Sequence, residues 1–288
     1  MMNEVVFLSY KDLPNGTDDD NLAKRELIRL GVNVQTVPWE SYENLITPHI
    51  PCVIRSPWNY TQNLNSFLNT LESLKSTNCL LNSFETIKNN SSKNYIIGLY
   101  KSSAAGKVVP SFSGVDTLNN SGASFEKLVV KPLVGASSVN TFLLESFEEV
   151  DCLFKKNPTF KKEDFFIQPY CKEVETTGEV SLIFFNIDGR KVFSHAVIKK
   201  PMLGDFRVQE EFGGNIAKIK PPENLITLSQ NFLGELSFPD FLFARMDYLL
   251  FNGHWCLSEA ELIEPDLYLR VDSEAPKKFA KAIAQYCK

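Results

Sequence analysis

The sequence of 288 residues has little of what redox proteins, metal–thiolate proteins and membrane proteins need. It contains three histidines and six cysteines, with no Cys-x-x-Cys pair and no histidine cluster. No apolar run approaches the roughly 20 residues that span a bilayer. The first residues, MMNEVVFLSYKDLPNG, lack the basic and long apolar segments of a signal peptide. We therefore expect a cytoplasmic protein with reduced thiols and no membrane partner.

Charge of one sign is not in large excess either. The 35 acidic and 30 basic residues give a net charge of −5, which argues against a nucleic-acid partner, although a local basic cleft stays open. A hydrophobic content of 43% and a charged content of 23% fit a globular protein with a real core. The length suits two or three lobes.

Short β-rich runs alternate with helical patterns in the first part of the chain. Strands are predicted at residues 4–10, 32–39, 52–58 and 79–83. The helical pattern NLAKRELIRLG between the first two strands ends at Gly31, as expected of a C-cap glycine. Strands that alternate with helices predict a small parallel α/β lobe.

The remaining two-thirds of the chain predicts an α+β arrangement with antiparallel hairpins. Residues 178–201 form one predicted hairpin, which turns at an Asp-Gly pair. Residues 241–263 form a second one, which turns at Asn252-Gly253. The fold class predicted from the sequence is therefore α/β plus α+β.

Three carboxylates are predicted to converge on the second hairpin. Glu259 and Glu261 alternate along one strand and so share a face, and the turn places Asp247 close to opposite Glu259. Like charges this close resist ionisation unless a cation lies between them, and an all-oxygen site suits Mg²⁺. Arg245, on the same face as Asp247, suggests a polyanion such as a phosphate chain as ligand. The alternative is a solvated outer face with Arg–Glu ion pairs.

The stretch VVKPLVGASSVN contains a second candidate site. Lys131 ends an apolar strand, and the small residues from Gly135 to Ser138 follow it. Small residues let backbone N–H groups approach an anion, and the lysine supplies a positive charge. The stretch lacks a Walker A pattern. The alternative is an ordinary surface turn after a strand.

Three further stretches are candidates for ligand contacts. IQPYCKEVETTGEVSL leaves a strand at a proline and could offer backbone groups to a flat base, or it could be a linker between lobes. Residues 193–215 combine His195, Lys199 and Arg207 with glycine-rich turns, which suits an anionic substrate. His195 alone fits a structural histidine better. RSPWNY ends a predicted parallel strand, so Arg55 either pairs with a substrate carboxylate or makes an internal salt bridge.

Taken in this order, these pieces resemble an ATP-grasp enzyme. The family pattern is R-x-D, a hairpin, then E-x-N-x-x-x-P, and this chain has Arg245-x-Asp247 and Glu259-x-Glu261-x-x-x-Pro265. Glu261 replaces the usual Asn, and its carboxylate can still bind metal. The chain is similar to the glutathione-synthetase and RimK-like carboxylate–amine ligases. It most resembles the O-ureido-serine cyclo-ligase group of the cycloserine pathway, through VIRSPWNY, FSHAVIKKP, GDFRVQEEFGG and ELIEPDLYL.

The resemblance covers roughly residues 88 to 270 and implies three regions. The first is an N-terminal α/β pre-ATP-grasp lobe at residues 1–90. The second is a small ATP-grasp subdomain with a lid loop at residues 91–168. The third is a C-terminal ATP-grasp subdomain with the metal site at residues 169–288.

The resemblance also implies ATP and Mg²⁺ as cofactors and assigns roles to residues. The implied metal ligands are Asp247, Glu259 and Glu261. The implied ATP contacts are Lys93, Lys131, Gly135, Ser137, Ser138, Gln168, Pro169, Tyr170, Cys171, Glu179 and Lys199. Lys88 competes with Lys93, and Glu173 competes with Glu179. The implied catalytic residues are Arg245 and Arg207, and the implied substrate contacts are Arg55, His195 and Arg207.

The implied reaction activates a small, amino-acid-like carboxylate as an acyl phosphate. An amine-type nucleophile then attacks, which forms a peptide bond or closes a ring. The expected partners are small carboxylates and amines, and a homodimer is allowed because several relatives form dimers. Two alternatives stay open: an ATP-binding regulatory module without catalysis, and a kinase that stops at phosphoryl transfer.

Overall fold

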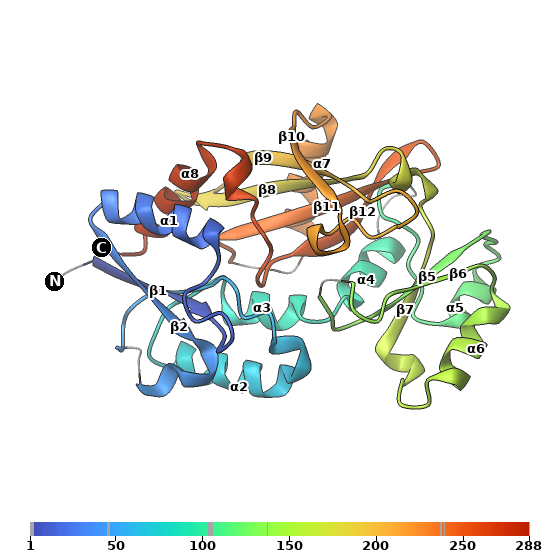
Figure 1. Ribbon diagram of the computed structural model, residues 1–288, viewed down its shortest axis with the longest axis horizontal. Coiled ribbons are helices and arrows are strands. Elements are labelled where there is room, and N and C mark those ends of the chain that lie inside the picture. Colours follow the sequence, from blue (N-terminus) through green and yellow to red (C-terminus); the bar gives the residue numbers. More distant parts are fainter. Residues whose placement is uncertain are drawn as a thin grey trace.

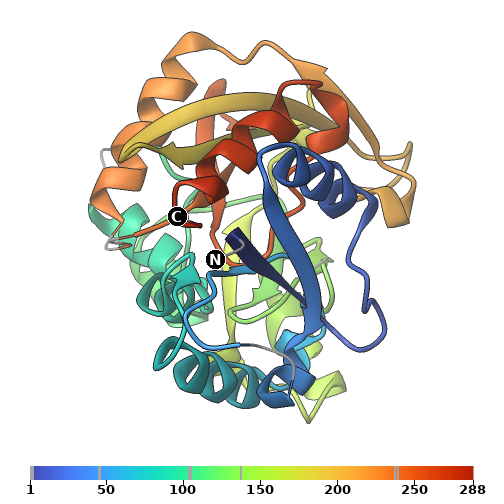
Figure 2. The same cartoon turned by 90° about the vertical axis from the view of Figure 1, so that its left-hand side faces the viewer.

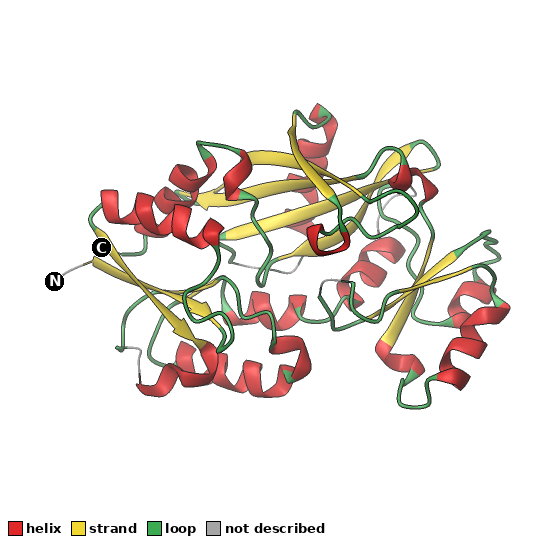
Figure 3. Cartoon of the chain, in the orientation of Figure 1, coloured by secondary structure: helices red, strands yellow, loops and turns green. Residues whose placement is uncertain are grey.

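The strands of the protein form three separate sheets, as the computed structural model shows (Figures 1 and 3). It describes residues 3–44, 47–102, 106–136, 138–236, 238 and 240–287. Within these ranges, no helix is long and apolar enough to cross a membrane. Short 3₁₀ helices lie at Trp39–Asn44, Tyr60–Gln62, Lys162–Asp164, Lys172–Glu175, Glu210–Phe212 and Leu269–Val271.

The N-terminal sheet is parallel, with the strand order β2-β1-β3-β4. Its strands are β1 (Asn3–Ser9), β2 (Val32–Pro38), β3 (Cys52–Ile54) and β4 (Leu80–Leu81). Its helices are α1 (Asp18–Arg29), α2 (Leu64–Lys75) and α3 (Phe84–Asn90). Alternate residues of β1 pack in different cores, Val5 with α1 and Val6 with α2, so the two helices cover opposite faces.

Helix α1 begins and ends at the residues that local chemistry favours. The Thr17 hydroxyl accepts a hydrogen bond from the Asp20 N–H at 3.1 Å, and the Asp20 carboxylate accepts one from the Thr17 N–H at 2.9 Å. Gly31 follows the last turn with φ +77°, a left-handed conformation that costs glycine little. The boundary predicted at Gly31 is confirmed.

A smaller antiparallel sheet has the order β6-β5-β7 and a core of its own. Its strands are β5 (Leu128–Pro132), β6 (Phe142–Leu144) and β7 (Phe165–Pro169). The helices of this region are α4 (Asn94–Ser102), α5 (Val115–Asn120) and α6 (Glu148–Lys156). Figure 1 shows this sheet at the end of the molecule away from the N-terminal lobe.

The largest sheet is antiparallel, with the order β10-β9-β8-β11-β12. Its strands are β8 (Glu179–Ile187), β9 (Arg190–Lys200), β10 (Asn215–Ile219), β11 (Phe243–Phe251) and β12 (His254–Glu261). Helix α7 (Glu223–Glu235) packs on one face and helix α8 (Ala275–Ala284) on the other. Asn252 and Gly253 both have positive φ, as the predicted hairpin turn requires.

The N-terminal lobe and the largest sheet share one core. Val5 and Leu27 of the lobe belong to the same buried cluster as Phe243 and Phe279, and α1 lies beside α8 in both ribbon views (Figures 1 and 2). Asn82, which follows β4, adds a buried polar link. Its amide donates hydrogen bonds to the Phe243 and Leu262 carbonyls at 2.9 and 2.6 Å. The lobe is therefore fixed against the strands that carry the acidic residues.

Candidate active site

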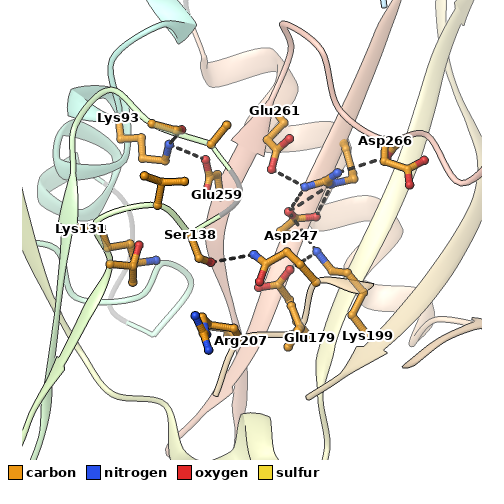
Figure 4. A pocket seen from close by; sticks show the side chains of 18 of the residues that line it. Lys93, Lys131, Ser138, Glu179, Lys199, Arg207, Asp247, Glu259, Glu261 and Asp266 are labelled. Atoms are coloured by element: carbon orange, nitrogen blue, oxygen red, sulfur yellow. Dashed lines mark hydrogen bonds and ion pairs between the residues drawn. The ribbon is translucent and has the colours of Figure 1, made fainter. Parts of the chain in front are cut away.

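A cavity of about 540 Å³ is lined by residues from all parts of the fold (Figure 4). Its walls include β5 and β7 of the small sheet, β8, β9, β11 and β12 of the largest sheet, and the segment that follows β3. A volume of this size suits a small-molecule ligand.

Most of the site residues predicted from the sequence line this cavity. They are Lys93, Lys131, Gly135, Ser138, Gln168, Pro169, Tyr170, Cys171, Glu179, Lys199, Arg207, Arg245, Asp247, Glu259 and Glu261. Ser137 lies outside the described residues. Between the two competing lysines, Lys93 lines the cavity, whereas Lys88 on α3 lies over the Phe84 ring at 5.9 Å from its centroid.

The two strands of the acidic hairpin pair in the predicted register. Asp247 is opposite Glu259, and Arg245 is opposite Glu261. A bulge follows Asp247, and Ser258 at this irregularity donates a hydrogen bond to the Asp247 carbonyl at 3.1 Å. All four charged side chains therefore belong to one wall of the cavity.

Strand β12 is the edge of its sheet, and side chains cover part of its outer backbone. The Asn90 amide donates to the Ala260 carbonyl at 2.8 Å and accepts from the Leu262 N–H at 2.8 Å. The Tyr95 hydroxyl donates to the Ala260 carbonyl at 2.7 Å. These contacts stabilise the edge strand that carries Glu259 and Glu261.

Basic residues hold each of the three acidic side chains. The Arg245 guanidinium donates to both Asp247 oxygens, at 3.0 and 2.9 Å, and its Nη2 also donates to Glu261. Lys199 lies 3.5 Å from Asp247 and pairs with Glu179, and Lys93 lies 3.1 Å from Glu259. Asp247 is 3% exposed and Arg245 is 7% exposed, so these ion pairs line a cavity wall instead of a solvated outer face.

These contacts give the carboxylates different proton affinities. Burial alone would raise the pKa of Asp247, but Arg245 and Lys199 outweigh it and lower the pKa to about 2. Burial raises the pKa of Glu261 to about 8 against the charge of Arg245, and Glu259 adds to the rise. Burial also raises the pKa of Glu264 to about 7, against the charge of Lys93. The wall therefore combines one carboxylate that stays ionised with two whose charged form is disfavoured by burial.

Among the described residues, no three acidic, histidine or cysteine side chains already lie close enough together to hold a metal ion. Asp247 and Glu259 are nevertheless direct cross-strand neighbours, and Glu261 lies two residues further along the same strand. The donors are all carboxylate oxygens, and the neighbouring carboxylates add to the rise in the pKa of Glu261 that burial causes. The residues present therefore fit a hard divalent cation, which would replace Arg245 and Lys93 as their partner.

Lys131 differs from the other lysines of the cavity. Burial lowers its pKa, and no carboxylate lies within 4.0 Å of its ammonium group among the described residues. Its nitrogen lies 5.8 Å from the centroid of the Phe166 ring. In Figure 4 it lies with Lys93 on the side of the cavity away from Asp266. It is therefore a half-buried cation available to an anionic ligand.

The loop between β5 and β6 is tied to the opposite side of the cavity. The Ser138 hydroxyl accepts a hydrogen bond from the Gln209 amide at 2.8 Å. A Cβ on Gly135 would lie 2.8 Å from the Pro132 side chain, so the tight course of this loop depends on glycine. Lys93 reaches the same loop and donates to the Gly135 carbonyl at 2.7 Å.

Arg207 is held in a fixed orientation at the edge of the cavity. Its guanidinium donates to both oxygens of Asp205, at 3.0 and 2.7 Å, and it stacks 3.8 Å from the centroid of the Phe212 ring. The same segment continues to Glu210, which pairs with Arg270. Arg207 therefore lines the cavity from a loop that the Glu210–Arg270 ion pair ties to the segment after β12.

Two predicted substrate contacts do not reach the cavity. Arg55 is buried in an ion pair with Asp20 at 2.9 Å and lies 5.4 Å from the centroid of the Phe243 ring, so the alternative of an internal salt bridge describes it. His195 is buried, with its Nε2 3.0 Å from the Leu267 carbonyl, and burial lowers its pKa to about 4. It is a neutral structural histidine.

Two residues at the site were not predicted from the sequence. Ser181 lies behind the cavity wall and donates a hydrogen bond to Asp247 at 2.6 Å, and nothing in the sequence around it distinguishes it from other strand serines. Glu264 lies in ELIEPD, a stretch that carried the family resemblance, and it lines the cavity. Its position in that stretch was a signal that the sequence did offer.

Comparisons with known proteins agree with this architecture. The family model described as D-cycloserine synthetase DcsG, N-terminal domain, matches residues 5–82. No curated protein matches the sequence. The crystal structure of D-cycloserine synthetase DcsG superimposes with a TM-score of 0.83 at 19% identity, covering 99% of this chain and 100% of that one.

Two further solved structures are similar over their whole length. D-alanyl-alanine synthetase A from Vibrio cholerae O1 biovar eltor has a TM-score of 0.69 at 13% identity, over 100% of this chain and 98% of that one. The ATP-grasp ligase PsnB, complexed with a phosphomimetic variant of its minimal precursor, Mg and ADP, has a TM-score of 0.64 at 13% identity, over 100% of both chains. The predicted ATP-grasp fold, with a parallel α/β lobe before it, is confirmed.

Proposed function

We propose that this chain, which has the ATP-grasp fold, is an ATP- and Mg²⁺-dependent ligase. It activates a small, amino-acid-like carboxylate as an acyl phosphate and joins it to an amine-type nucleophile, by peptide bond formation or ring closure. One observation carries the proposal. A single cavity brings together three buried or half-buried lysines, two arginines and the carboxylates of one hairpin.

The ATP would lie between the small sheet and the largest sheet. Lys131, which lacks a carboxylate partner among the described residues, and Lys93 would contact phosphates. The backbone of residues 168–171 would bind the base, because the Gln168 side chain is already bonded to Ser111 at 2.9 Å. Glu179 would contact the ribose. The loop that contains Gly135 and Ser138 would cover the phosphates.

Mg²⁺ would be held by Asp247, Glu259 and Glu261 and would neutralise phosphate charge. Lys131, Lys199 and Arg245 would offset charge on the phosphoryl group as it transfers, in a site that excludes water. Arg207, oriented by Asp205, would hold the reacting carboxylate or stabilise the tetrahedral oxyanion. The loop at Ser138 would protect the acyl phosphate from hydrolysis.

The names of the similar proteins support this proposal. D-cycloserine synthetase and D-alanyl-alanine synthetase are named for a cyclic product and a dipeptide, and PsnB is a ligase with Mg and ADP bound. The match of the N-terminal lobe to the D-cycloserine synthetase model favours ring closure. We expect the substrates to be small carboxylates and amines, and the cytoplasm and a homodimer remain our expectations for location and assembly.

The test is ADP release from ATP and Mg²⁺ with a panel of amino acids and O-ureidoserine, with and without hydroxylamine. A ligase releases ADP only when its carboxylate is present, and hydroxylamine traps the acyl phosphate as a hydroxamate. Turnover without a hydroxamate would indicate a kinase. ATP binding without turnover on any carboxylate would indicate a regulatory module.

A further inference from the structure

One part of the cavity has no role in the proposed binding of ATP. It is lined by Trp58 and Tyr60, which follow β3, and by Ile263 and Glu264, which follow β12. The N-terminal lobe thus supplies aromatic side chains to this part, and the end of the acidic hairpin supplies a carboxylate.

Glu264 is exceptional among the carboxylates that line the cavity. Six of the eight lie within 4.0 Å of a lysine or arginine nitrogen: Glu179, Glu210, Asp247, Glu259, Glu261 and Asp266. Of the other two, Glu211 is exposed to solvent. Glu264 is only 9% exposed and has no such cation among the described residues.

The surroundings of Glu264 favour an organic cation as its partner. Tyr60 interacts electrostatically with its carboxylate, and Trp58, 44% exposed, lines the same cavity. A buried carboxylate is costly without a cation. Aromatic rings attract ammonium groups through their faces, whereas a small metal ion prefers oxygen ligands and water.

The protein's own nearest cation is already engaged. Lys93 influences Glu264 more than any other basic group does, but its ammonium lies 3.1 Å from Glu259 and 2.7 Å from the Gly135 carbonyl. In the proposed function Lys93 also contacts phosphate. With Lys93 engaged, the described side chains offer Glu264 no close positive charge, and a substrate ammonium group can supply one.

We propose that Glu264, together with Tyr60 and Trp58, forms a subsite that binds the ammonium group of an amino-acid substrate. The inference rests on the proposed function and names the substrate class that this site selects. Glu264 is a specificity residue: it favours an amino acid over the deaminated acid of the same shape. Tyr60 orients the carboxylate, and Trp58 covers the ammonium group on its open side.

The experiment measures binding, so that it does not depend on turnover. Calorimetry at pH 7.5 with Mg²⁺ and AMPPNP compares the affinity for alanine with that for propionate, and the affinity for serine with that for 3-hydroxypropionate. Each amino acid is tested as its D and L forms, and O-ureidoserine is a further ligand. We expect at least one amino acid to bind more tightly than the deaminated acid of the same shape. Glu264→Gln keeps the shape and removes the charge, and it should reduce this preference about 30-fold or more, because it leaves a buried ammonium unpaired.

Two further variants separate a charge effect from a structural one. Glu264→Asp keeps the charge and should retain the preference at lower affinity. Glu163→Gln removes an exposed carboxylate outside the cavity and should change nothing. The subsite is refuted when Glu264→Gln keeps the wild-type preference, or when no amino acid binds more tightly than the deaminated acid of the same shape. A preference that depends on Glu264 in a protein that does not bind AMPPNP would support the subsite and refute the proposed function.

Discussion

Replacing Asp247 tests the proposed metal and ATP site directly, because its effect on the free energy of unfolding can be measured separately from its effect on ADP release. Asp247→Asn removes one negative charge from a side chain that is 3% exposed and bound by Arg245, Lys199 and Ser181. Arg245 keeps Glu261 and Lys199 keeps Glu179 as partners, so neither cation is left alone.

The expected loss of stability follows from these remaining partners. Breaking a buried pair outright costs about 3–5 kcal/mol, so we expect about 2–3 kcal/mol here, measured as the free energy of unfolding in urea. Mg²⁺-dependent ADP release should fall by about 100-fold or more, because an amide is a poorer metal ligand than a carboxylate.

Glu259→Gln is the matched variant. Glu259 and its partner Lys93 are less buried, with side chains 24% and 15% exposed, so the loss of stability should be under about 1 kcal/mol. ADP release should nevertheless fall as far as in Asp247→Asn. Two folded variants with wild-type ADP release would refute the assignment of Mg²⁺ to this hairpin.

Three further predictions concern other parts of the fold. Lys131→Met should leave the free energy of unfolding unchanged or higher, because burial already disfavours the charge of Lys131, and the affinity for AMPPNP in calorimetry should fall at least about tenfold. An unchanged affinity would show that Lys131 does not contact the nucleotide. Burial lowers the pKa of His195 from 6.5 to about 4, so its contribution of about 3 kcal/mol is complete above pH 6.5 and is lost as the pH falls to 4. In His195→Asn, urea unfolding should therefore depend less on pH in that range, and an identical pH profile would contradict this. Asn82→Ala should lose about 3 kcal/mol in urea unfolding, since several buried hydrogen bonds disappear, and a loss below 1 kcal/mol would show that this link is unimportant.

The acidic hairpin shows what the sequence can predict. The Asn252-Gly253 turn fixes the register of β11 and β12, because both residues adopt the positive φ of a tight hairpin. Counting outward from the turn brings Asp247 opposite Ser258, and the bulge beside Asp247 moves its partner by one residue to Glu259. Local turn chemistry and a side-chain period of two therefore located this wall to within one residue, but they did not predict the bulge.

The partners of Arg55 and His195 show what the sequence could not predict. Arg55 pairs with Asp20, 35 residues away, and nothing local reveals that α1 brings a carboxylate beneath it. His195 bonds to the Leu267 carbonyl, 72 residues away. Whether a polar side chain faces a cavity or a core depends on packing between distant elements, which periodicity does not encode.

The separate core of the small sheet has a consequence for how ligands enter. The N-terminal lobe and the largest sheet share buried residues, whereas β5, β6 and β7 pack mainly among themselves. Domain closure of this kind usually bends at the few residues between rigid bodies. We expect the small sheet to move as one rigid body. This motion would open and close the proposed ATP site, while the part of the cavity around Tyr60 and Glu264 keeps its shape.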